Sequence, residues 1–264
     1  MMDKNVIFMS AGEINDELAE IKHEYPDVVF LSTNGKAASV LRTGRLIGNG
    51  AGNTQIHAVT GDIEMIINVT VKASENGVRF PLLITRNNGL LPDDIPDDLV
   101  RIPKGTWLWN LKADLLVSKK CLDAYTAMAV QAAKEDVVMR VTSAYRSYND
   151  QIEALSIQAR RYGEKRAKEL GAPAGFSEHQ LGLALDLGGW IDESGIQMTK
   201  NEEVYKWIDD NCYKYGFMIK NPPGKEHITG GIYEPWHIRY IGDLDIAKYV
   251  HERGITLNEY LEQL

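Results

Sequence analysis

The stretch that decides the fold is Ser177-Glu178-His179-Gln180-Leu181-Gly182-Leu183-Ala184-Leu185-Asp186. A second stretch further along the chain complements it: Glu234-Pro235-Trp236-His237. Two imidazoles, one carboxylate and a nearby Glu suit a catalytic zinc ion, which takes nitrogen and oxygen ligands in a tetrahedron. Such a site uses three protein ligands and leaves the fourth position to water. A Glu that is not a ligand can take a proton from that water. The two stretches therefore predict a catalytic metal site.

The segment from Leu181 to Gly188 alternates as a strand does. Its leucines point one way, and Gly182, Ala184, Asp186 and Gly188 point the other way. The leucine face belongs to a core, whereas the opposite face is nearly bare around one carboxylate. A bare face leaves room for a metal ion and a substrate. The alternative is that the glycines permit close backbone packing and that Asp186 is a surface residue.

The other candidate ligands need breaks in regular structure. His179 precedes Asp186 by seven residues, so a continuous strand would put the two side chains on opposite faces. We therefore expect His179 in the loop that includes residues 171–177, where the backbone can turn it inward. Glu234 and His237 are three apart, so an irregular strand entry is expected at Pro235-Trp236, with a strand over 238–241.

Composition excludes several classes of protein. The chain has 264 residues, 44% hydrophobic and 25% charged, as in globular proteins. Its net charge of −8 argues against a nucleic-acid partner. The sequence has no apolar run near the ~20 residues of a membrane span, and residues 1–10 lack the apolar core of a signal peptide. The chain is therefore cytoplasmic, trimmed, or released by another route. Cys121 and Cys212 are expected to be buried free thiols.

The N-terminal region is expected to be all-β, up to about residue 75, after a short helical lead-in. Met65, Ile67, Val69 and Val71 alternate with Ile66, Asn68 and Thr70, which is the period of a half-buried strand. Frequent glycines between residues 44 and 61 separate short strands.

This region also resembles a known family. Gly35-Lys36-Ala37-Ala38-Ser39-Val40, followed by the glycine-rich stretch 44–56, is similar to the bacterial Ig-like (group 2) sandwich. The resemblance covers roughly residues 20–75 and implies a spacer or adhesion module without catalytic residues. We therefore predict an Ig-like β domain with its lead-in over residues 1–78 and a second domain over residues 79–264.

The second domain is predicted to be α+β, with a small antiparallel sheet flanked by helices. It follows a linker that begins at Asn76-Gly77 and reaches the Pro-rich run 91–98. The patterns predict helices over 119–134, 150–170 and 201–215, a strand over 137–143, and a C-terminal helix that opens with the capping box Thr256 to Glu259.

The metal motifs carry a second resemblance. Ser177-x-His179-x-x-Gly182-x-Ala184-x-Asp186, with Glu234-Pro235-Trp236-His237-x-Arg239-Tyr240, resembles the VanY-type D-alanyl-D-alanine carboxypeptidases, which are zinc peptidases. The resemblance covers about residues 84–262. It includes Ser143-Ala144-Tyr145-Arg146-Ser147 with Gln151.

The resemblance implies a role for each matching residue. His179, Asp186 and His237 would bind Zn²⁺. Glu234 would be the base, and Arg146 would meet the substrate carbonyl, where a permanent positive charge suits a developing oxyanion.

Further substrate contacts are implied more loosely. Tyr145, Gln151 and Ser177 would hold the terminal carboxylate or the peptide amides. Trp236 would pack to orient His237 or line the cleft. Many relatives have Arg-Tyr-Pro where this chain has Lys220-Asn221-Pro222-Pro223, a departure that affects peptide preference and not the metal site.

The implied function is a zinc D,D-carboxypeptidase that removes the terminal D-Ala from peptidoglycan stem peptides. An L,D-carboxypeptidase acting on tetrapeptide stems would use the same site. A non-hydrolytic cell-wall-binding module is the alternative from another class, against which the intact Glu234 and Arg146 argue. The substrate implies a cell-wall or extracellular location, while a cytoplasmic or phage-lysin origin stays open.

Overall fold

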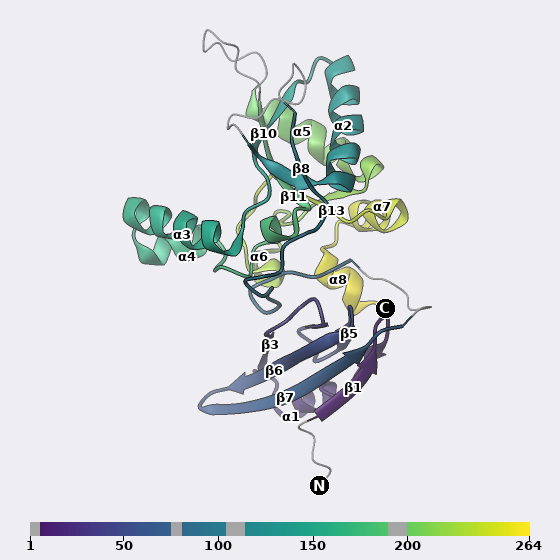
Figure 1. Cartoon of the computed structure of the whole chain (residues 1–264), viewed down its shortest axis with the longest axis vertical. Helices are drawn as coiled ribbons and strands as arrows, with labels where there is room; N and C mark the ends of the chain where they lie inside the picture. The colour runs from purple at the N-terminus through teal and green to yellow at the C-terminus, as the bar shows by residue number, and fades with distance from the viewer. Residues whose placement is uncertain (1–5, 75–80, 104–113, 190–199) are drawn as a thin grey trace. The chain divides into compact units, whose positions relative to one another are not determined.

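The computed structural model describes residues 6–74, 81–103, 114–189 and 200–264 (Figure 1). The chain folds into two compact units. The first comprises Met1–Pro92, Ala172–Ser177 and Asn258–Leu264, and the second comprises Asp93–Gly171 and Glu178–Leu257. Residues 81–92 belong to the first unit, where the Asn88 side chain accepts from Val40 N and donates to Val40 O. The predicted domain limits of 1–78 and 79–264 stay a prediction.

The first unit contains two sheets. The four-stranded sheet has the order β1 (Val6–Ser10), β7 (Ile63–Lys72), β6 (Gly52–Thr60) and β3 (Val29–Ser32). The three-stranded sheet has the order β2 (Ile14–Asn15), β5 (Leu46–Gly48) and β4 (Ala38–Val40). β1 runs parallel to β7, and the other pairs are antiparallel. The helix α1 (Ala19–Glu24) follows β2, so the expected helical lead-in is itself preceded by strands.

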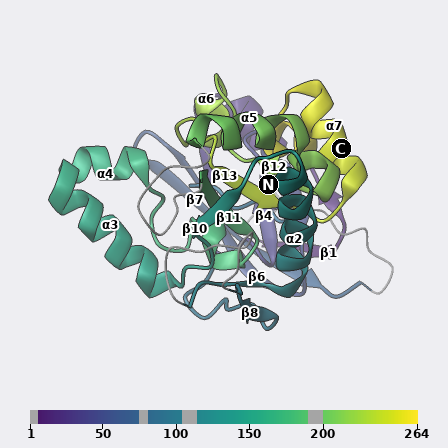
Figure 2. The same cartoon turned by 90° about the horizontal axis from the view of Figure 1, so that it is seen from above.

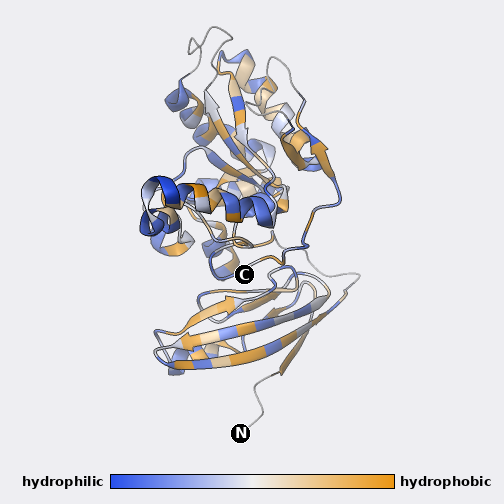
Figure 3. Ribbon diagram, turned by 60° about the vertical axis from the view of Figure 1, so that its left-hand side comes forward, coloured by the Kyte–Doolittle hydropathy of each residue, from blue (hydrophilic) through white to orange (hydrophobic). Residues whose placement is uncertain are grey.

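Both sheets bury their apolar side chains in one core. Ile67, Val69 and Val71 of β7 are buried, whereas Asn68 is exposed and Thr70 is partly exposed, which confirms the predicted alternation. The alternating bands along β6 and β7 are visible in Figure 3. Phe30 of the larger sheet and Leu46 of the smaller sheet belong to the same cluster. A β-rich unit is thus confirmed, while its assignment as an Ig-like domain stays a prediction.

The second unit is α+β, as predicted. Its central antiparallel sheet has the order β10 (Met139–Ser143), β11 (Ala184–Gly189), β13 (His237–Tyr240) and β12 (Phe217–Ile219). A second ladder joins β8 (Leu99–Arg101) to β9 (Leu116–Ser118). Its helices are α2 (Lys119–Lys134), α3 (Tyr148–Tyr162), α4 (Glu164–Leu170), α5 (Asn201–Asn211), α6 (Glu226–Thr229) and α7 (Leu244–Arg253). The helix α8 (Leu257–Glu262) begins at the last residue of this unit, and its other residues belong to the first unit. Figure 2 shows α3 and α4 side by side.

The core of this unit lies against the leucine face of β11. Leu185 and Leu187 are fully buried with Val141 of β10 and with Tyr125 and Met128 of α2. The predicted division of β11 into a leucine face and a face that carries Asp186 is therefore confirmed. In the parts of the chain that the structure describes, no helix is both long and apolar enough to cross a membrane.

Several predicted elements need correction. The strand expected from Leu181 begins at Ala184, because residues 178–181 form the 3-10 helix η1 and Gly182 has φ +65°. The helix expected over 150–170 is two helices, because Gly163, with φ +84°, ends α3 and precedes α4. The helix expected over 201–215 becomes the 3-10 helix η2 (Cys212–Tyr215) after Asn211. Cys121 and Cys212 are free and buried, as expected.

Candidate metal and catalytic site

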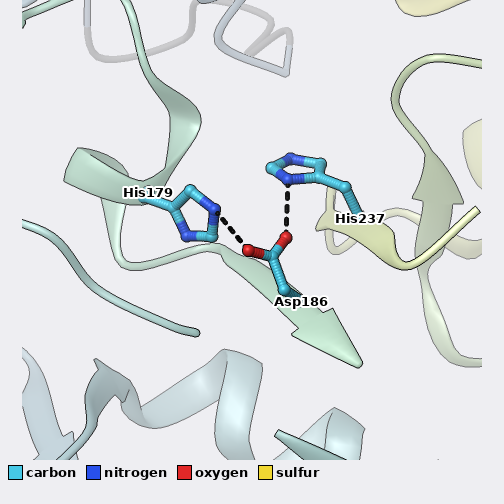
Figure 4. Close-up of side chains that lie close together, drawn as sticks. All are labelled: His179, Asp186 and His237. Carbon is cyan, nitrogen blue, oxygen red and sulfur yellow. Dashed lines mark hydrogen bonds and ion pairs between the residues drawn. The ribbon is translucent and has the colours of Figure 1, made fainter. Parts of the chain in front are cut away.

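Three side chains from separate segments form one cluster. His179 lies in η1, Asp186 lies in β11, and His237 is the first residue of β13. One ligand atom from each lies within 4.8 Å of the others. Asp186 is paired with His237 in the β11–β13 ladder, which places those two side chains side by side. Figure 4 shows both rings turned toward the Asp186 carboxylate.

The carboxylate of Asp186 uses one oxygen for each ring. His179 Nε2 lies 3.3 Å from Oδ2, and His237 Nδ1 lies 3.0 Å from Oδ1. The two rings meet edge to face, with centroids 5.0 Å apart and planes at 89°. Two nitrogens and one oxygen therefore converge from three directions. This donor set is the one that zinc accepts.

Each imidazole ring is oriented by the group that its second nitrogen, the one turned away from Asp186, contacts. His179 Nδ1 lies 2.7 Å from the Ala144 carbonyl, which can only accept, so Nδ1 carries the proton and Nε2 is free to bind a cation. His237 is turned the other way: its Nδ1 faces Asp186, and its Nε2 lies 3.5 Å from Glu178 Oε2. The two histidines thus offer different ring nitrogens to the same point.

Burial and neighbouring charges set the protonation of the cluster. Burial alone would raise the pKa of Asp186. The opposite effect of His179 and His237 is larger and holds this pKa well below its ordinary value, so the carboxyl is ionised. Burial also lowers the pKa of His179 below its ordinary value, which favours the neutral ligand form. Burial lowers the pKa of His237 too, but Asp186 and Glu178 outweigh it and raise that pKa to about 9. A buried anion between two imidazoles is an environment that a divalent cation fits.

Glu234 lies outside the three-residue cluster and is held separately. The Asn221 side-chain amide donates to Glu234 Oε2 at 2.7 Å, and Glu234 N donates to Asn221 O at 3.3 Å. The predicted break at Pro235-Trp236 is present: His237 N donates to Glu234 O at 3.1 Å, and β13 begins only at His237. Glu234 is thus tied to a metal-ligand candidate while its own carboxylate is oriented by another residue.

Arg146 lies between β10 and α3, with its guanidinium fixed at two points. Nη1 donates to Gln151 Oε1 at 2.8 Å, and Nη2 donates to Ser143 Oγ at 2.9 Å. Arg146 N donates to His179 O at 3.2 Å, which ties this segment to η1. Its positive charge also contributes to the lowered pKa of His179, after burial.

The remaining predicted substrate contacts are Gln151, Tyr145, Trp236 and Ser177. Gln151 is buried and contacts Arg146. Tyr145 is half-buried, and its N donates to Leu116 O at 2.8 Å. The Trp236 ring lies 6.2 Å from the Tyr205 ring. Ser177 is buried at the end of the segment that groups with the first unit.

The sequence alone missed three supporting residues. Ser143 and Asn221 hold Arg146 and Glu234, and Glu178 lies beside His237. Glu178 and Ser143 stand within the motifs themselves, but motif membership does not say which way a side chain points. Asn221 stands in the loop that departs from the family pattern, so no family signal marked it.

The fold and the site together define a metal-dependent peptide hydrolase. A family model described as "VanY: D-alanyl-D-alanine carboxypeptidase" matches residues 114–243. The chain belongs to this family, whose members are metallo-carboxypeptidases. A D-alanyl-D-alanine carboxypeptidase of Enterococcus faecalis is 33% identical over 201 residues, covering 73% of this chain and 69% of the relative.

Two solved structures are similar to this chain. The LD-carboxypeptidase LdcB is 37% identical with a TM-score of 0.58, covering 69% of this chain and 85% of that one. A variant of the vancomycin-resistance D,D-pentapeptidase VanY, in complex with Zn(II), is 30% identical with a TM-score of 0.55, covering 68% and 97%. Zinc in that homologue agrees with the predicted cofactor. The matched family segment begins at residue 114, so it does not reach the N-terminal β unit.

Proposed function

We propose that this chain is a zinc-dependent D-alanyl-D-alanine carboxypeptidase that removes the C-terminal D-Ala from peptidoglycan stem peptides. His179, Asp186 and His237 are its proposed zinc ligands. The observation that carries this proposal is the convergence of their ligand atoms within 4.8 Å, in a buried site where each ring is oriented by a separate partner. A VanY homologue in complex with Zn(II) supports the choice of metal.

The other catalytic roles are assigned to residues of this chain. Bound zinc supplies Lewis acidity toward the scissile carbonyl and the attacking water. Glu234 takes a proton from that water at Oε1, since Asn221 occupies Oε2, and passes the proton to the leaving amine of D-Ala. Arg146 cannot lose its charge, so it stabilises negative charge on the carbonyl oxygen. Gln151 and Ser143 fix its guanidinium in advance of the reaction.

An L,D-carboxypeptidase acting on tetrapeptide stems is the second candidate. The similarity to LdcB, an LD-carboxypeptidase at 37% identity, favours it. The similarity to a D,D-pentapeptidase at 30% identity and to the D-alanyl-D-alanine carboxypeptidase family favours the first candidate. The metal cluster is the same for both candidates, so the distinction rests on how the peptide is held near Tyr145, Ser177 and Trp236.

Mass spectrometry of stem peptides separates these functions. The zinc-loaded protein is incubated with a pentapeptide that ends in D-Ala-D-Ala and, separately, with a tetrapeptide that ends in one D-Ala. Loss of one alanine from the pentapeptide is expected. Loss from the tetrapeptide alone would assign L,D cleavage. If protein with stoichiometric zinc cuts neither peptide, the chain is a non-hydrolytic wall-binding module.

For the N-terminal region we propose a bacterial Ig-like spacer over residues 1–78, ahead of a zinc carboxypeptidase domain over residues 79–264. The shared core of two small sheets supports this assignment. A spacer would present the second unit to cell-wall peptidoglycan. Sedimentation of the full chain, as Glu234→Gln, with isolated peptidoglycan would test the proposed location, and a protein that stays in the supernatant would contradict it.

A further inference from the structure

A buried carboxylate lies next to the metal cluster and has no role in the proposed reaction. Glu178, the residue before His179, is only 2% exposed. Its Oε1 lies 2.7 Å from Arg239 Nη1 and 3.8 Å from Lys220 Nζ. Glu178 thus has the cationic side chains of Arg239 and Lys220 on one side.

The pair formed by Glu178 and Arg239 is costly to bury. Arg239 is 1% exposed and is among the largest fully buried side chains of the described chain. Desolvation of such ions costs several kcal/mol each, and apolar residues of similar size often stabilise a fold as well or better. Fold stability is therefore a weak reason for this pair. Glu178 adjoins His179, and Arg239 follows His237 by two residues, so the pair joins the two ligand-bearing motifs.

The two oxygens of Glu178 have different neighbours. Oε1 accepts from Arg239, whereas the buried Oε2 has no hydrogen-bond partner within the usual limits and lies 3.5 Å from His237 Nε2. His237 Nε2 is likewise buried without a closer partner among the described residues. Its ring therefore stands between two carboxylates, with Asp186 at Nδ1 and Glu178 at Nε2.

We infer that Glu178 is a positioning residue for the metal site: Arg239 fixes its carboxylate, which accepts the Nε2–H of His237 and leaves Nδ1 as the ligand atom. This inference rests on the proposed zinc site. The outer partners differ between the two rings, because His179 donates to a neutral carbonyl and His237 faces an anion. An anionic partner makes an imidazole a more basic ligand. His237 is thus the stronger nitrogen donor of the two.

Glu178→Gln tests the inference while keeping the shape and one oxygen for Arg239. Loss of an outer-shell partner costs about 10–100-fold in metal affinity, so zinc should bind that much more weakly in competition with a chromophoric chelator. Glu64→Gln is the matched control, because Glu64 pairs with His57 at 2.6 Å in the first unit. It should bind zinc as the unsubstituted protein does. Thermal melting of the metal-free proteins reports whether each is folded.

A second measurement does not depend on any variant. Long-range ¹H–¹⁵N correlation spectra of the zinc-loaded, ¹⁵N-histidine-labelled protein show which ring nitrogen carries a proton. His237 should be protonated at Nε2 and His179 at Nδ1. A His237 that carries its proton at Nδ1 would overturn the inference, whatever the affinities show.

The outcomes separate this inference from the function on which it rests. If the unsubstituted protein binds no zinc, the proposed metal site fails and the inference fails with it. If that protein binds zinc and a folded Glu178→Gln binds it equally well, only the inference is overturned. Should Glu178→Gln not fold, the double variant Glu178→Gln/Arg239→Gln removes the unpaired charge, and its zinc affinity should still be lowered. Unchanged affinity in the double variant would also overturn the inference.

Discussion

Each unit of this protein contains a histidine beside a carboxylate, and the two pairs differ in what surrounds them. His57 and Glu64 lie 2.6 Å apart on neighbouring strands of the first unit, with 24% and 53% of their side chains exposed. His237 and Asp186 lie 3.0 Å apart on neighbouring strands of the second unit, with 9% and 17% exposed. Water screens the first pair, whereas in the second pair only protein groups or a bound cation can balance the charge. Burial and a third converging ligand, rather than short distance, mark a metal site.

The largest effect is expected when the buried pair is broken. Asp186→Asn removes the proposed anionic ligand, so zinc affinity should fall by more than the roughly 100-fold that loss of an outer partner costs. Hydrolysis of stem peptides should become undetectable. Zinc content after dialysis and peptide mass spectra measure both effects. Retention of stoichiometric zinc by this variant would show that the ion binds elsewhere.

Removal of the proposed base, Glu234, should lower turnover without changing zinc binding. Glu234→Gln is expected to lower kcat by about 10²–10⁴-fold, the usual contribution of a general base. Zinc content should stay at one ion per chain, because Glu234 lies outside the ligand cluster. A variant that loses zinc would identify Glu234 as a ligand, and the ion would then have one fewer coordination position open to water or substrate.

Loss of Asn221, which orients Glu234, should lower kcat less than loss of Glu234 itself. Asn221→Ala removes the hydrogen bond to Glu234 Oε2, and a bond to a charged group is worth about 1.5–3 kcal/mol. We expect kcat to fall by about 10–100-fold with zinc affinity unchanged. Steady-state kinetics on the cleaved stem peptide, beside a chelator competition, would show the two effects apart. Equal kcat in the variant would mean that Glu234 is oriented by other contacts.

The smallest effect should come from the exposed pair. Glu64→Ala is expected to change the free energy of unfolding by about 0–1 kcal/mol, as for most surface ion pairs. Chemical denaturation monitored by circular dichroism measures this change, and peptide hydrolysis should be unaltered. A loss of several kcal/mol would show that the first unit depends on this contact, and the contrast between the two pairs would then fail.

The sequence could predict the elements whose signal is local. The alternation of β11 separates Leu185 and Leu187 from Asp186, because one period-2 pattern fixes both faces of a strand. The spacing of Glu234 and His237 requires a break, and the break lies at Pro235-Trp236. For the residues that form η1, the sequence predicts only an irregular loop, because a four-residue 3-10 helix is too short to show a hydrophobic period.

The supporting contacts could not be predicted in the same way. Glu178 and Arg239 are 61 residues apart, and nothing local distinguishes a buried ion pair from two solvated charges. Asn221 meets Glu234 only because β12 leads its loop back beside β13. Motifs therefore point to candidate catalytic groups, while the groups that orient them depend on which strands become neighbours.

One irregularity of β10 has a consequence for how the site tolerates change in length. Val141 is paired with Leu187 and Ser143 with Asp186, so Thr142 is an extra residue in a bulge. Before the bulge, the buried side chains of β10 face the core. After the bulge, the alternation of faces is shifted by one residue, so that Ser143 lies on the opposite face and contacts Arg146. Deletion of Thr142 would restore an even ladder and leave Ser143 opposite Asp186, whereas a regular strand that kept Thr142 would put Ser143 on the same face as Val141. The single inserted residue thus acts as a phase shift, which lets one short strand serve the core at one end and the guanidinium at the other.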